Sequence, residues 1–128
     1  MAEKYRYAEC ILYPDSMIGD WQDRIDDLIQ LPFAYCKHDK DECKSHVHLI
    51  LIHNNTVALS FFQKWCNIRL SREGCLCCST VEPVLNPQRA WDYLIHNTPT
   101  ARKEGKYQNH YHKFFLIQDT DICPLFLQ

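Results

Sequence analysis

The distribution of apolar and polar residues along the chain predicts five strands. Apolar and aromatic residues dominate residues 5–13 and 31–36, and a turn or a charged loop follows each run, as is typical of β-strands. Residues 46–52 are apolar on both faces beyond their start, so we expect this strand to be central. Two further strands are expected near residues 76–81 and over residues 110–117.

Helical periodicity predicts three helices between these strands. Apolar residues recur at helical spacing over residues 18–30, and a second helix is expected from an N-cap at Thr56 to residue 70. Asn86 followed by Pro87 predicts a third helix, up to residue 96, because Asn caps well and Pro at the first position loses no needed hydrogen bond. The order of elements suggests an α+β fold, an antiparallel sheet with packed helices of the ferredoxin-like or split βαβ class.

Composition is that of one folded domain covering residues 1–128. Hydrophobic residues make up 46% and charged residues 23%, which argues against disorder. No apolar run approaches the ~20 residues of a membrane-spanning helix, and the first residues lack a signal peptide's apolar stretch. We therefore expect a cytoplasmic protein with no membrane partner. The formal charge of −2 gives no bulk support for nucleic-acid binding, so any DNA function must rest on a local site.

Eight cysteines are expected to be reduced thiols, because no secretory signal accompanies them. One functional alternative is a non-catalytic interaction module that binds structural zinc. Its ligands would be Cys75, Cys77 and Cys78, helped by Cys36, Cys43 or a histidine. Adjacent cysteines at 77 and 78 fit the usual Cys-x-x-Cys knuckle poorly.

Histidines at the head of the central strand indicate a metal site. His46 and His48 project from the same face of a strand, about 6.6 Å apart along the chain, so both rings can approach one ion. If the strand before them is a neighbour, His38 and Asp41 end near His46 and complete a set of three or four ligands. Imidazole suits Zn, Mn, Fe, Ni or Cu, and an added carboxylate favours Mn or Mg. An isolated pair would instead be an ordinary surface feature; the upstream His38 and Asp41 favour the metal site.

A competing pair occurs at His110 and His112, which also precedes an apolar run. No acidic residue stands at comparable spacing before it. We interpret this pair as the solvent-exposed end of a strand.

The third predicted helix carries a possible nucleophile. Arg89, Tyr93 and His96 fall on the side away from its apolar face. A tyrosine hydroxyl has a pKa near 10 and needs a metal or base beside it to attack. Alone, Tyr93 would be an ordinary residue of an amphipathic helix, but with a His-x-His metal site it becomes a candidate for attack on a phosphodiester.

Together these motifs resemble the origin-binding and nicking domain of RepB-type plasmid replication initiators, rolling-circle proteins of the HUH endonuclease superfamily. The resemblance extends over about residues 5–117. The matching segments are LYPDS at 12–16, DW at 20–21, HDKD at 38–41, HVHLILI at 46–52, VLN at 84–86 and YLIH at 93–96. It implies a fold in which the His-x-His strand and the tyrosine helix face one another.

The resemblance also implies the site and its chemistry. The metal ligands would be His38, Asp41, His46 and His48, binding Mn²⁺ or Mg²⁺, and the nucleophile would be Tyr93. The implied reaction is sequence-specific nicking of single-stranded or hairpin origin DNA through a 5′-phosphotyrosine. The released 3′ hydroxyl would prime the host replication machinery, and a second strand transfer would close the nick. The phosphotyrosine ester conserves the bond energy, so no nucleotide cofactor is expected.

Candidate DNA contacts are the basic residues near this site, Arg89, Arg102, Lys103 and Lys106. The last three lie in a polar, locally basic stretch over residues 97–108. The alternative is that these basic residues are ordinary solvated surface charges without a function. Within the enzyme class, an HUH transposase or relaxase is the nearest alternative, and the length of the chain counts against a relaxase.

Overall fold

The helices and strands follow the predicted order. The computed structural model describes residues 3–38, 45–94 and 111–115. In chain order the elements are β1 (Lys4–Leu12), the short 3₁₀ helix η1 (Pro14–Ser16), α1 (Trp21–Ile29), β2 (Phe33–His38), β3 (His46–Ala58), α2 (Leu59–Leu70), β4 (Cys78–Pro83), α3 (Pro87–Leu94) and β5 (Tyr111–Phe115). None of these helices is long and apolar enough to cross a membrane.

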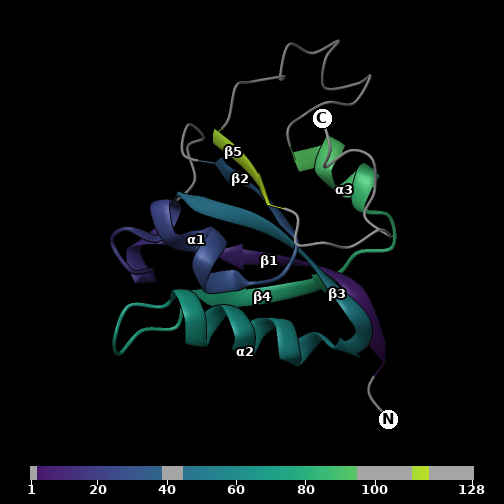
Figure 1. The fold of residues 1–128 in the computed structure, drawn as a ribbon, viewed down its shortest axis with the longest axis horizontal. Helices are drawn as coiled ribbons and strands as arrows, with labels where there is room; N and C mark the ends of the chain where they lie inside the picture. The colour runs from purple at the N-terminus through teal and green to yellow at the C-terminus, as the bar shows by residue number, and fades with distance from the viewer. Residues whose placement is uncertain (1–2, 39–44, 95–110, 116–128) are drawn as a thin grey trace.

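The strands form one antiparallel sheet in the order β4-β1-β3-β2-β5 (Figure 1). Helix α1 connects β1 to β2, and β3 lies between these two strands. Helix α2 connects β3 to β4, with β1 between them. These are two split βαβ units, so the predicted α+β fold is confirmed. The prediction that the strand beginning at His46 is central is also confirmed.

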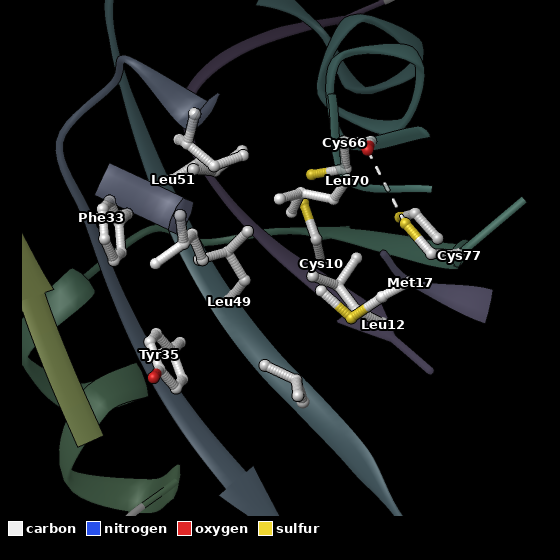
Figure 2. Packing of buried hydrophobic residues seen from close by; sticks show 14 of the residues in the cluster. Cys10, Leu12, Met17, Phe33, Tyr35, Leu49, Leu51, Cys66, Leu70 and Cys77 are labelled. Atoms are coloured by element: carbon white, nitrogen blue, oxygen red, sulfur yellow. Dashed lines mark hydrogen bonds between the residues drawn. The ribbon is translucent and has the colours of Figure 1, made fainter. Parts of the chain in front are cut away.

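Helices α1 and α2 pack on one face of the sheet and bury the main core there (Figure 1). Side chains alternate along a strand, so every second residue of β1, β2 and β3 points into this layer. Figure 2 shows the strand residues facing the residues of α2 and the loops. The buried cluster contains Ala8, Cys10, Leu12, Met17, Trp21, Ile25, Ile29, Phe33, Tyr35, Val47, Leu49, Leu51, Phe62, Cys66, Leu70, Cys77 and Cys78.

The opposite face of the sheet carries the remaining alternate residues. Ala34, Cys36, Ile50 and Ile52 are at most 1% exposed, yet none of them belongs to the cluster beneath α1 and α2. Helix α3 contacts β3 and lies away from α1 and α2 (Figure 1). Its Trp91 is also buried outside that cluster. We conclude that α3 covers part of the second face.

The predicted cap of α3 is confirmed, because the Asn86 side-chain oxygen accepts a hydrogen bond from the Arg89 backbone N–H at 3.1 Å. The predicted cap of α2 is wrong. Thr56 lies within β3, whose pairing with β1 continues to Ala58, so the helix begins only at Leu59. Here the extended ladder overrides the local capping signal.

Several boundaries also differ from the predicted ones: the strand expected over residues 31–36 is β2, Phe33–His38, and it includes His38. Helix α1 begins at Trp21 instead of residue 18, because a 3₁₀ turn and a bridge at Met17 precede it. Strand β4 lies two residues later than expected, since its ladder with β1 extends to Pro83.

Candidate metal centre

Pairing of β2 with β3 brings three histidines together. His38 stands directly opposite His46 in the antiparallel register, and His48 lies two residues further along the same face. The ring centroids are 5.3 Å apart for His38 and His46, 4.5 Å for His38 and His48, and 4.9 Å for His46 and His48. One possible ligand atom from each ring lies within 4.8 Å of the others. The prediction that His38 approaches the His-x-His pair is therefore confirmed.

This donor set fits a transition-metal ion. Metal–imidazole bonds are about 2.0–2.1 Å long for zinc, so ligands of one ion stand about 3–4 Å apart, which small side-chain movements would reach here. Nitrogen donors favour Zn, Mn, Fe, Ni or Cu over Mg, whose preferred ligands are oxygens. His38 is 7% exposed, whereas His46 and His48 are partly exposed. The cluster is thus anchored on its buried side and accessible from the other.

A carboxylate that the sequence analysis did not identify contacts this cluster. Glu9 Oε1 lies 2.6 Å from His48 Nδ1. Glu9 pairs with Ile50 across the β1–β3 ladder, which puts it on the same sheet face as His48. The available signal was one charged residue, Glu9, among the apolar and aromatic residues of the segment 7–13. Its meaning depends on the register of β1 against β3, which only the structure reveals.

The other predicted site residues are placed only in part. Tyr93 belongs to α3, the helix that contacts β3, and its side chain lies outside the described part of the structure. Arg89 is exposed on the same helix. Outside the described residues lie Asp41, Arg102, Lys103 and Lys106, with the whole of residues 97–108.

The cysteines do not form the zinc site of the alternative prediction within the described residues. The group of potential metal ligands that converges there is the three histidines, and no cysteine belongs to it. No disulfide joins the six described cysteines. Cys75 is partly exposed, whereas Cys36 is buried in β2. Cys43 lies outside the described residues.

Three buried thiols meet instead between β1, α2 and β4. Hydrogen bonds with Cys66 and Cys78, together with burial, raise the pKa of Cys10. For Cys66, the hydrogen bond with Cys10 lowers the pKa, but the bond with Cys78 and burial outweigh it and raise the pKa. Hydrogen bonds with Cys10 and Cys66 lower the pKa of Cys78 to about 4. Next to them, the Cys77 thiol donates to the Cys66 carbonyl at 3.7 Å, as the dashed line in Figure 2 shows.

Fold and site define an α+β domain whose antiparallel sheet presents a candidate histidine metal centre on the face that α3 partly covers. The family described as "Plasmid replication protein, origin binding domain" matches residues 1–121. The chain therefore belongs to this family. It is 30% identical over 129 aligned residues to "Replication protein RepB" of Streptococcus agalactiae, an alignment that covers 94% of this chain. The chain spans about 60% of the length of that relative.

Proposed function

We propose that this chain binds a plasmid replication origin, nicks one strand there, and so initiates rolling-circle replication. The observation that carries the proposal is the convergence of His38, His46 and His48 in a member of the origin-binding family. Origin binding alone requires no cluster of three imidazoles, whereas cleavage of a phosphodiester gains from a bound cation. The contact of α3 with β3 supports the same function, because α3 carries Tyr93.

His38, His46 and His48, with Asp41, would hold the ion, and the three imidazoles favour Mn²⁺ over Mg²⁺. When bound, a divalent ion supplies Lewis-acid neutralisation of charge on the scissile phosphate. The Tyr93 hydroxyl attacks phosphorus and gives up its proton, and a phosphotyrosine ester forms. The bond from phosphorus to the 3′ oxygen breaks, and that oxygen takes up a proton.

Recognition of DNA rests on local charge in this proposal, because the chain carries a formal charge of −2. Arg89, Arg102, Lys103 and Lys106 contact phosphates, and the strand to be cut must be unpaired, as in a hairpin loop. The released 3′ hydroxyl is extended by the host replication machinery. The reaction consumes no nucleotide cofactor, because attack of the new 3′ end on the phosphotyrosine closes the strand.

A covalent adduct tests this function. Single-stranded oligonucleotides that tile the DNA from which the gene comes, labelled at the 3′ end, are incubated with the protein and MnCl₂ and separated under denaturing conditions. We expect the label to migrate with the protein, and EDTA to prevent this. Tyr93→Phe keeps the ring and deletes the attacking oxygen, so it should bind DNA but form no adduct.

Matched controls are the two other tyrosines near the basic stretch. Tyr107→Phe and Tyr111→Phe should still form the adduct. A nucleotide mapped to either of these residues would reassign the nucleophile and keep the enzyme class. If the wild-type protein forms no adduct with Mn²⁺, Mg²⁺ or Zn²⁺, the nicking activity is wrong and origin binding without cleavage remains.

A further inference from the structure

Glu9 makes a short contact with one of the three clustered histidines and has no role in the mechanism proposed above. Its Oε1 lies 2.6 Å from His48 Nδ1, and the two side chains are 18% and 16% exposed. The pair is thus mostly shielded from solvent, unlike a surface ion pair. A charge-assisted hydrogen bond of this length holds both groups in one orientation.

The contact assigns different tasks to the two ring nitrogens of His48. Nδ1 donates to the carboxylate, so Nε2 carries the lone pair that can bind an ion. Metal-binding histidines commonly donate their second ring nitrogen to a carboxylate in this way, which fixes the tautomer and the ring plane and makes the ligand more basic. The ring of His48 lies closest to that of His38, 4.5 Å between centroids.

The same geometry argues against Glu9 being a metal ligand itself. Its Oε1 lies at hydrogen-bond distance from His48 Nδ1, which is the ring nitrogen that does not bind the ion in this arrangement. The group of ligand atoms that lie within 4.8 Å of one another consists of the three histidines without Glu9. A register partner of Glu9 provides a comparison: Glu82 stands directly opposite it on β4, on the same sheet face, and is exposed.

We infer that Glu9 is a positioning residue, which sets the tautomer and orientation of His48 so that the three imidazoles bind a divalent transition-metal ion. The inference rests on the metal centre of the proposed function. Loss of such an outer carboxylate typically weakens metal affinity by about 10- to 100-fold. Glu9 must influence metal affinity through His48. A general contribution of Glu9 to the stability of the fold would not depend on His48, so the two roles can be separated.

Metal affinity, measured without DNA, tests the inference. Mn²⁺ is titrated into the full chain and free Mn²⁺ is followed by electron paramagnetic resonance. The variants are Glu9→Gln, which keeps the shape and removes the charge, His48→Ala, the double variant, and Glu82→Gln as the matched control. We expect Glu9→Gln to bind about 10- to 100-fold more weakly and Glu82→Gln to bind like the wild type.

The double variant decides whether Glu9 acts through His48. Once His48 is alanine, Glu9→Gln should change the residual affinity no further, because the residue that Glu9 orients is gone. If Glu9→Gln weakens metal binding as much in His48→Ala as in the wild type, Glu9 acts through the fold or as a ligand, and the positioning role is overturned. This comparison holds even if Glu9→Gln destabilises the metal-free protein.

Cobalt absorption gives a second readout. At saturating Co²⁺, Glu9→Gln should retain the wild-type visible bands, because the inner ligands are unchanged; altered bands would identify Glu9 as a ligand and refute the inference. Unchanged Mn²⁺ affinity in Glu9→Gln would overturn the role of Glu9 alone. Failure of the wild-type chain to bind Mn²⁺ or Co²⁺ would overturn the metal centre together with it.

Discussion

Replacement of His46 by alanine should remove most of the stabilisation that a bound metal gives the protein. The three imidazoles come from two neighbouring strands, and His46 contacts both other rings. An ion held by all three therefore ties β2 to β3 at the end where the two strands meet. Because the unfolded chain does not hold these rings together, metal binding raises the free energy of unfolding.

The size of this effect follows from the chain length and mass action. Metal at 100 times its dissociation constant adds about 2.7 kcal/mol to the free energy of unfolding. For 128 residues the unfolding entropy is about 0.27 kcal/mol per kelvin, so Tm should rise by about 10 °C. If His46→Ala weakens binding 100-fold, about 0.4 kcal/mol remains at the same metal concentration, and the rise falls below about 2 °C.

Thermal unfolding followed by circular dichroism, in EDTA and in MnCl₂, measures the metal-dependent rise in Tm for the wild type and for His46→Ala. His53→Ala is the matched control, since His53 lies on the same strand but its Nδ1 accepts a hydrogen bond from the Asn55 backbone N–H at 3.0 Å, outside the cluster. It should keep the full metal-dependent rise. The same rise in His46→Ala as in the wild type would refute the assignment of His46 as a ligand.

Two further predictions concern the packing around the site. Asn86→Ala should cost about 1 kcal/mol of unfolding free energy in urea titrations, because it removes the cap of α3, whereas Arg89→Ala should keep that cap, whose donor is the backbone N–H. A second prediction concerns Cys77, because burial raises the pKa of its thiol above the ordinary value near 9. The protonated thiol therefore contributes its full stabilisation below pH 9, and this contribution is lost as the pH rises through the pKa of the thiol in the folded protein. The urea midpoint should therefore decrease more between pH 8 and pH 10.5 for the wild type than for Cys77→Ala. An equal decrease in both proteins would contradict this account of Cys77.

Much of the site could be predicted because it depends on local pattern. Alternation along a strand puts His46 and His48 on one face whatever surrounds them. The short connection from the preceding strand makes an antiparallel neighbour the natural expectation, and that pairing brings His38 opposite His46. Glu9 could not be found in this way, because 40 residues lie between it and Ile50, its partner on β3.

The sequence by itself determined the types and order of the helices and strands, the cap at Asn86 and the pair His46 and His48. Each of these depends on interactions within a few residues, such as side-chain alternation, helical spacing or a cap hydrogen bond. Only the tertiary structure decided the register of β1 against β3, that β3 continues past Thr56, and that Glu9 meets His48. The physical reason is that strand pairing is non-local: which edges share hydrogen bonds depends on burying the faces of the whole sheet, and no short segment contains that information.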